Sequence, residues 1–293
     1  MYKIIEISSK SEIEQLGTKE KFWVNDVKKG CKQLFKIGRE NTGENWAEKV
    51  ACELAKLIEL PHAQYELAKF EDKIGTISDS FVPNNSRFIH GNELLAKIDR
   101  EYPADQFYRV RDYKLEIVLN LVRLMERNNS IMGSLNQFIG YIVFDCLIAN
   151  QDRHHENWGY LIDETGNVTL APTYDHAAGF GCKVSAEDAK KRVETNDMKF
   201  TVESFCRRAK TPFYNKDEKK VSTYDACRIA AKFDKDAFCD WVDRVSEIQV
   251  KDLENIFEQI PSEWIKKDII TFSIRVIQVN QKRLVALKEE VCL

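Results

Sequence analysis

The chain has 293 residues, of which 43% are apolar and 31% are charged, with few glycines and prolines. This is an ordinary globular composition. It excludes extended disorder, and the length allows a sizeable core in one two-lobed domain or two small ones. The net charge of −3 gives no electrostatic reason to expect direct binding to nucleic acid or to an anionic membrane.

Residues 1 to about 90 alternate strand-like runs with one helix. The expected strands cover residues 2–7, 22–24, 33–37, 64–70 and 73–81. The helix follows Thr42 and Gly43, and one of its faces carries Ala47, Val50, Ala51, Leu54, Ala55 and Ile58. Strands with a single helix are typical of the small lobe of a kinase, and residues 83–86 form a loop signal that marks a hinge.

Lys36 lies in the third expected strand, between Phe35 and Ile37. The period-2 alternation of a strand places the lysine on the face opposite these two apolar side chains. A lysine there either snorkels at a sheet edge or pairs with the α- and β-phosphates of a nucleotide. We favour the phosphate role, because a helix with candidate acidic partners follows closely.

After Asn92 the pattern becomes helical. One helix is expected over residues 113–127, and the next, over 135–149, is apolar nearly all round and is therefore the central buried helix. Residues 182–221 are charged and irregular, and three further helices are expected after them, the last from about 262 to 290. We therefore expect an α+β, two-lobed, protein-kinase-like fold with an N-lobe over 1–85 and a mainly helical C-lobe over 86–293.

An Asp and an Asn lie five residues apart at 152 and 157, directly after the buried helix, and Asp175 follows eighteen residues later. Strand-like runs at 158–162 and 168–171 flank a dense turn signal, so a hairpin returns Asn157 and Asp175 to the same end of a small sheet. In kinase-type phosphotransferases the first Asp orients and deprotonates the attacking hydroxyl, while the Asn and the later Asp hold Mg²⁺ against the nucleotide phosphates. We assign Asp152 to catalysis and the other two residues to the metal.

Arg153 and His154 stand beside Asp152. We assign both to the catalytic group, with the task of bracing the Asp through hydrogen bonds; His154 could instead be a packed core histidine. His155 and Glu156 fall between the functional positions, and we expect them to be solvated.

A carboxylate–imidazole cluster offers a different interpretation, a Zn²⁺ or Fe²⁺ hydrolase. Its members would be Asp152, His154, His155, Asp175 and His176. We disfavour it because the chain has no His-Glu-x-x-His pattern and no histidine after His176.

The string Asp152-Arg153-His154 with Asn157, followed by Tyr174-Asp175, resembles the catalytic and metal-binding segments of HipA-like kinases. The stretch from Leu34 to Pro61 is similar to the family's strand with the nucleotide lysine and the helix behind it. The resemblance covers roughly residues 15 to 180. It implies a short form without an extra N-terminal subdomain, such as HipT-type or CtkA-type kinases.

The resemblance also implies the remaining nucleotide contacts. Glu48 would pair with Lys36, with Glu44 and Glu53 as rivals, and Gly17 would belong to the phosphate-covering loop, although no Gly-x-Gly-x-x-Gly occurs in the chain. We also assign Phe81 and Val82, just before the hinge, to the nucleotide-binding residues.

The expected activity is ATP- and Mg²⁺-dependent phosphoryl transfer to Ser or Thr of a protein substrate, in a toxin-type or effector kinase with an antitoxin as a further partner. Autophosphorylation is expected near Gly17, where the candidates are Ser8, Ser9, Ser11 and Thr18. A phosphoinositide-type lipid kinase is the enzymatic alternative, since phosphoinositide kinases share the Asp-Arg-His-x-x-Asn string. A nucleotide-binding pseudokinase that acts as a binding module is the non-enzymatic one.

Eight cysteines show no Cys-x-x-Cys pair and no knot-like spacing. We expect buried, reduced thiols and hence a reducing cytoplasm. The N-terminus shows no signal-peptide pattern, and residues 138–149 are too short a run to span a bilayer.

Overall fold

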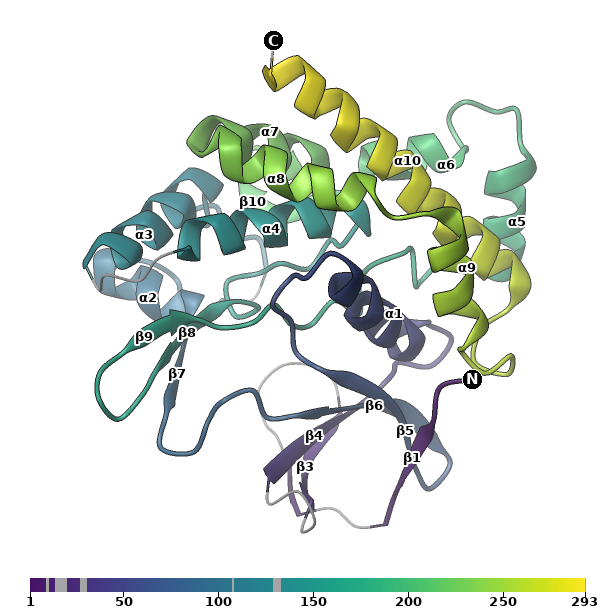
Figure 1. The fold of residues 1–293 in the computed structure, drawn as a ribbon, viewed down its shortest axis with the longest axis horizontal. Coiled ribbons are helices and arrows are strands. Elements are labelled where there is room, and N and C mark those ends of the chain that lie inside the picture. Colours follow the sequence, from purple (N-terminus) through teal and green to yellow (C-terminus); the bar gives the residue numbers. More distant parts are fainter. Residues whose placement is uncertain (9–10, 14–19, 27–30, 107, 129–132, 293) are drawn as a thin grey trace.

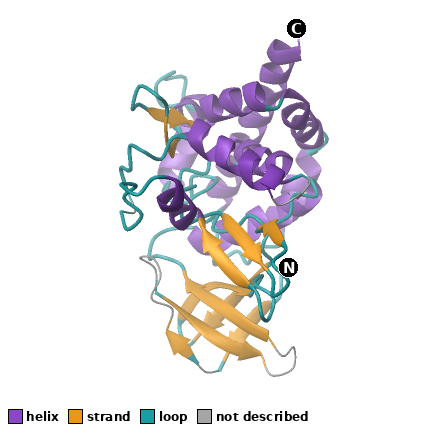
Figure 2. Ribbon diagram, turned by 90° about the vertical axis from the view of Figure 1, so that its left-hand side faces the viewer, coloured by secondary structure: helices purple, strands orange, loops and turns teal. Residues whose placement is uncertain are grey.

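A computed structural model describes residues 1–8, 11–13, 20–26, 31–106, 108–128 and 133–292 of the chain. Its largest sheet lies at one end of the molecule and most of its helices at the other (Figure 1, Figure 2). The α+β, kinase-like fold class expected from the sequence is confirmed. The division at 85/86 stays a prediction.

The N-terminal part is built on a six-stranded sheet in the order β1-β5-β6-β4-β3-β2. The strands are β1 (Ile4–Ile7), β2 (Glu12–Ile13), β3 (Lys21–Asp26), β4 (Cys31–Ile37), β5 (Tyr65–Phe70) and β6 (Lys73–Asp79). β1 runs parallel to β5, and the other neighbours are antiparallel. On one face, Phe22, Phe35 and Phe70 form an aromatic core with ring centroids 5.0–5.1 Å from the ring of Phe22.

Helix α1 (Glu44–Leu57) packs against β5 and β6. The apolar face read from the sequence is buried as expected, with Ala47, Ala51 and Leu54 fully inaccessible. The helix starts after Gly43, where an added Cβ would lie 2.1 Å from the indole nitrogen of Trp46. Only glycine fits this close approach, which lets Trp46 cover the first turn of the helix.

The predicted hairpin is present as β8 (Gly159–Ile162) and β9 (Val168–Leu170), and it has a third strand that the sequence analysis missed. This strand, β7 (Arg87–His90), pairs antiparallel with β8 and leads directly into helix α2 (Gly91–Ile98), which was also missed. Because the sheet partner of β7 lies about 70 residues further on, local pattern could not reveal it.

Helix α4 (Ser134–Leu147) is the centre of the C-terminal part, as its apolar character predicted. Helices α3 (Leu115–Asn128), α7 (Thr223–Phe233), α8 (Lys235–Ser246) and the long α10 (Lys267–Cys292), which crosses the bundle, pack against it (Figure 1). Helix α9 (Val250–Glu258) packs on α1 and α10. Residues 223–292, which the structure describes without a gap, form four helices. Three were expected from the sequence. Asp234 makes the extra break, since its carboxylate accepts the N–H of Ala237 and caps α8.

The expectation of an irregular segment over 182–221 was wrong. It contains α5 (Ala186–Glu194), α6 (Val202–Arg208) and a hairpin of β10 (Lys210–Tyr214) and β11 (Lys220–Ser222). Ser185 and Thr201 cap the two helices through their hydroxyls. Only a narrow apolar stripe packs on α10, so the high charge of the exposed faces concealed the helical period.

None of the described helices is both long and apolar enough to cross a bilayer.

Candidate functional site

A cavity of about 290 Å³ lies between the six-stranded sheet and the loops that follow α4 and β9. Lys36, Asp152, Asn157 and Asp175, four residues assigned from the sequence, all line it. Phe81, Val82 and His154 line it as well. The sequence therefore named residues from four separate segments that the fold brings to one cavity. Gly17 lies outside the described residues.

Lys36 reaches the cavity from β4. Phe35 beside it is fully buried in the core of the opposite sheet face, so the alternation read from the sequence holds. The ammonium of Lys36 lies 3.4 Å from Oδ1 of Asp175 and 5.5 Å from the ring centre of Tyr65. Burial lowers the pKa of Lys36, but the carboxylates of Asp175 and Glu48 outweigh it, so the net shift is upward. The lysine therefore carries its charge at neutral pH.

Glu48 is 1% exposed and faces the same region from α1. Its Oε1 accepts the backbone N–H of His176 at 3.2 Å, and together with Lys36 it lines a small cavity behind the main one. The two rival acids have other cations: Glu44 lies 2.7 Å from Arg39, and Glu53 lies 2.7 Å from Lys49. Of the three, Glu48 is therefore the acid whose geometry best suits the positioning of Lys36.

The loop that carries Asp152 is folded back against the end of α4. The side-chain amide of Asn150 donates to Oδ1 of Asp145 at 2.8 Å, and its oxygen accepts the N–H of Asp152 at 3.2 Å. At the other end, the amide nitrogen of Asn157 donates to the carbonyl of Asp152. These contacts fix both ends of the loop, and the carboxylate of Asp152 stands at the cavity.

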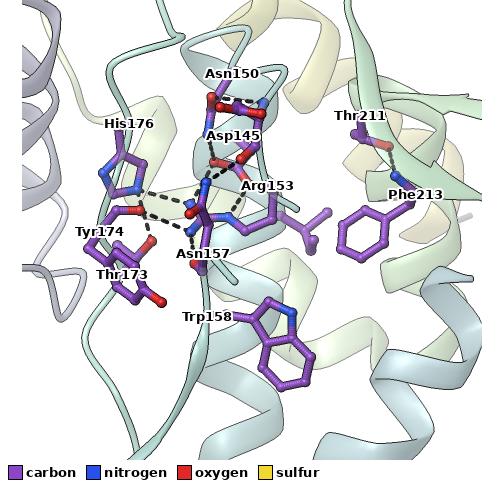
Figure 3. A network of polar contacts seen from close by, with 12 residues as sticks. Asp145, Asn150, Arg153, Asn157, Trp158, Thr173, Tyr174, His176, Thr211 and Phe213 are labelled. Atoms are coloured by element: carbon purple, nitrogen blue, oxygen red, sulfur yellow. Dashed lines mark hydrogen bonds and ion pairs between the residues drawn. The ribbon is translucent and has the colours of Figure 1, made fainter. Parts of the chain in front are cut away.

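Arg153 lies behind this loop and does not line the cavity (Figure 3). It is 1% exposed, and its Nε and Nη2 each donate to one oxygen of Asp145 at 2.8 Å. Nη1 donates to the carbonyls of Asn157 at 2.7 Å and Tyr174 at 3.3 Å, and Nη2 lies 3.0 Å from Nε2 of His176. Arg153 thus ties the end of α4 to the segments that carry Asn157 and Asp175, and we interpret it as a positioning residue rather than one that touches substrate.

The two histidines of the loop behave differently. His154 lines the cavity, and burial lowers its pKa to about 4, so it is neutral; its Nδ1 accepts the N–H of Glu156. The expectation that His155 is solvated was wrong. It is 1% exposed, and its Nδ1 lies 2.7 Å from the hydroxyl of Tyr102, which belongs to the segment after α2.

Asp175 and Asn157 offer the cavity oxygen ligands. The amide nitrogen of Asn157 is engaged with the carbonyl of Asp152, which leaves the side-chain oxygen as its other polar atom. Asp175 sits at φ 58°, a left-handed conformation that an aspartate tolerates better than most residues. One carboxylate and one amide oxygen suit Mg²⁺, which is bound through few protein oxygens together with water and phosphate.

The alternative Zn²⁺ or Fe²⁺ site finds no support in the described part of the chain, where no group of three or more His, Cys, Asp or Glu side chains could hold a metal. His155 bonds to Tyr102, and His176 is buried against Arg153 and Thr173. Both imidazoles are used in packing.

Aromatic side chains also line the cavity. Phe81, Phe88 and Tyr174 pack with ring centroids 5.2–5.9 Å apart, and Leu34 and Val82 are further lining residues. The cavity therefore combines an aromatic cluster with the lysine, the carboxylates and the amide. Such a lining suits a ligand with a flat heterocycle and an anionic tail.

Sequence reasoning missed Asp145, Tyr65 and Phe88. Asp145 did give a signal, because it is the one acidic residue in an otherwise apolar helix. A buried carboxylate requires a partner, and that requirement points to a cation from another segment.

The comparisons with known proteins agree with this architecture. The family model described as HipA-like C-terminal domain matches residues 14–250. The kinase CtkA of Helicobacter pylori, described as proinflammatory, has a crystal structure that superposes with a TM-score of 0.80 at 17% identity, covering 99% of both chains. HipA of Shewanella oneidensis, solved with HipB and operator DNA, superposes with a TM-score of 0.61 at 13% identity, covering 97% of this chain and 68% of that one.

Among curated proteins, no sequence matches this chain. At such identities the two superpositions speak for the fold alone, whereas the family match extends over more than half of the sequence. The chain belongs to the family of HipA-like C-terminal domains.

Proposed function

We propose that this chain is an ATP-dependent serine/threonine protein kinase of the HipA-like type. One observation carries the proposal. Lys36, Asp152, Asn157 and Asp175 line a single cavity that Phe81, Phe88 and Tyr174 also line. The family to which the chain belongs and its resemblance in fold to the kinase CtkA support the same class of enzyme.

In this proposal adenine lies against Phe81, Phe88 and Tyr174, and the triphosphate extends toward Lys36. Val82 would contribute backbone atoms at the hinge; its N–H now donates to Oγ of Ser80 at a long 3.3 Å, a bond that a nucleotide can replace. Lys36 would exchange its contact with Asp175 for the α- and β-phosphates, while Glu48 keeps the ammonium oriented.

The transfer step forms a bond between the acceptor oxygen and the γ-phosphorus and breaks the bond from that phosphorus to the β-bridging oxygen. ADP leaves with the electron pair. The carboxylate of Asp152 orients the acceptor hydroxyl and takes its proton. Mg²⁺, held by Asn157 and Asp175, would neutralise charge on the phosphates when bound. Most of the rate enhancement in such a site comes from positioning and electrostatics.

Purified protein incubated with γ-labelled ATP, Mg²⁺ and a bacterial extract tests this function. We expect phosphoserine or phosphothreonine with the wild type, and a loss of at least about 100-fold in rate with Asp152→Ala, which should still bind Mg·ATP. Phosphorylated lipid in phosphoinositide vesicles without phosphoprotein would instead indicate a lipid kinase. Nucleotide binding without any transfer would indicate a pseudokinase.

We further propose autophosphorylation in the N-terminal segment. Ser9 and Thr18 lie outside the described residues, while Ser11 is exposed and its hydroxyl donates to the carbonyl of Trp23, a cavity residue, at 2.7 Å. A phosphate near this wall would repel the γ-phosphate and compete for Lys36, and would switch the enzyme off. Peptide mass spectrometry should find phosphate within residues 8–18 of the wild type and none in Asp152→Ala.

The partner and the location complete the proposal. The Shewanella HipA was solved with HipB, and an antitoxin-type protein partner is proposed for this chain by analogy. All eight cysteines are free thiols, as suits the reducing cytoplasm that we propose from their spacing.

A further inference from the structure

A second cavity, of about 190 Å³, adjoins the cavity proposed for the nucleotide. The two cavities share Tyr108, Asp152 and His154 as lining residues. The second one also takes residues from the segment after α2, including Arg109 and Tyr113, and from the β10–β11 hairpin, including Lys220. It therefore offers an acceptor a space that borders Asp152 and extends beyond the residues of the first cavity.

Two cations line this cavity beside the proposed base. Arg109 and Lys220 are both exposed, and neither guanidinium nor ammonium forms an ion pair with any described carboxylate. The neighbouring Arg111 differs, since it lies 3.1 Å from Glu218. Arg109 is also held at φ 61°, a costly conformation for a residue with a side chain. The cavity thus presents two cations that are not paired with a described carboxylate, beside the carboxylate of Asp152.

His155 adds a buried polar atom at the same place. It lines the cavity, is 1% exposed, and its Nε2 has no hydrogen-bond partner within the described residues. If the Tyr102 hydroxyl donates to Nδ1, only the N–H at Nε2 is left without a partner. The opposite arrangement would leave both the Tyr102 hydroxyl proton and Nε2 unsatisfied. In the favoured tautomer the buried Nε2 of His155 therefore carries an N–H that no described residue accepts.

We propose that this second cavity is the acceptor site, and that it selects a hydroxyl residue whose neighbour in the substrate protein carries an oxyanion. Arg109 and Lys220 would bind a carboxylate or phosphate on that neighbour, and Asp152 would receive the hydroxyl. The inference rests on the proposed kinase activity and adds to it the chemistry of the acceptor. A cavity of about 190 Å³ has room for the side chains of a protein substrate.

Peptides test this selection. A set with one central Ser in a Gly/Ala background would carry Asp, phosphoserine, Asn or Lys at a single position, moved through the three residues on either side. The wild type should prefer the Asp or phosphoserine peptide over its Asn counterpart at one or more positions by about tenfold in kcat/KM, and should disfavour Lys. The Asp and phosphoserine arms distinguish the two sources of the oxyanion.

Arg109→Gln combined with Lys220→Gln should remove this preference while the affinity for Mg·ATP stays unchanged, because neither residue lines the nucleotide cavity. Arg109→Glu combined with Lys220→Glu should reverse it toward the Lys peptide. Arg111→Gln and Lys219→Gln are matched controls, since they remove neighbouring charges that do not line the cavity, and they should keep the preference.

Equal rates on Asp, Asn and Lys peptides, or a preference that survives in the Arg109/Lys220 variants, would overturn the acceptor proposal alone. So would phosphorylation of other proteins with no transfer to any of these peptides, or transfer only to phosphoinositide vesicles. Absence of transfer to every peptide, protein and vesicle would instead overturn the proposed kinase activity itself.

Discussion

The two sides of the cavity that we propose for the nucleotide are held in different ways. On the sheet side, Lys36 contacts Asp175 over 3.4 Å, with 12% and 25% of the two side chains exposed. On the helical side, Arg153 and Asp145 form two bonds of 2.8 Å, with 1% and 3% exposed. Arg153 then donates to the backbone of both segments that carry the proposed metal ligands.

We expect the Arg153–Asp145 pair to stay intact when a ligand binds and the Lys36–Asp175 pair to be replaced. A fully buried, bidentate pair fixes the loop that carries Asp152 before any ligand arrives, as the proposed catalysis requires. A single, longer and partly hydrated ion pair between Lys36 and Asp175 is weak enough for phosphates and a metal ion to replace it. Substitutions that remove one of these contacts at a time test which ion pair holds the site in place.

The largest effect is expected from Asp145→Asn. The substitution leaves the buried charge of Arg153 without a counter-ion, and the free energy of unfolding should fall by about 3–5 kcal/mol. Urea unfolding followed by circular dichroism measures it. Glu290→Gln is the control, since it removes the exposed partner of Arg228 and should cost no more than about 1 kcal/mol. Equal losses in the two variants would mean that the buried network does not brace the loop.

Next in size is Asp175→Ala. Loss of a proposed metal ligand should lower kcat/KM by at least about 100-fold and abolish the Mg²⁺-dependent part of ATP affinity, with the fold retained. Calorimetric titration of ATP with and without Mg²⁺ checks this. Glu164→Gln, on the exposed turn of the β8–β9 hairpin, should behave as wild type. A normal Mg²⁺ dependence in Asp175→Ala would remove this residue from the metal site.

Lys36→Met should weaken ATP binding and activity while changing the free energy of unfolding by less than about 1 kcal/mol, because its ion pair is partly hydrated. The thermal shift produced by Mg·ATP in the wild type should be absent. Lys69→Met, on β5 of the same sheet but outside the cavity, is the matched control. An equal shift in wild type and Lys36→Met would return Lys36 to a structural role.

The smallest effect concerns pH and a contact between the two sides. His62 forms a β-bridge with Thr173, and its Nδ1 donates to the carbonyl of Leu60 while Nε2 accepts from Gln64, so the ring is neutral. Burial lowers its pKa from 6.5. Below 6.5 the unfolded chain binds the proton more readily, so this stabilisation exists at higher pH and is lost as pH falls.

Thermal unfolding of wild type and His62→Gln should therefore differ more at pH 7.5 than at pH 5.5. A difference that does not change with pH would show that His62 does not titrate in this window.

Elements with local signals could be predicted from the sequence alone. The apolar face of α1, the all-apolar α4 and the hairpin after Asn157 each follow from periodicity or turn residues within about 15 positions. Because these elements are local, the spacing of Asp152, Asn157 and Asp175 was enough to predict that the three converge, and they do line one cavity.

Contacts that join distant segments could be seen only in the folded structure. β7 pairs with a strand about 70 residues later, and α5 and α6 depend on α10 for burial. Local sequence patterns also did not predict that Tyr102 contacts the buried His155. Nor did they predict that Lys36 pairs with Asp175, 139 residues away. In each case the stabilising free energy comes from apolar burial or ion pairing between segments. The residues next to one partner in the sequence do not indicate which distant segment supplies the other.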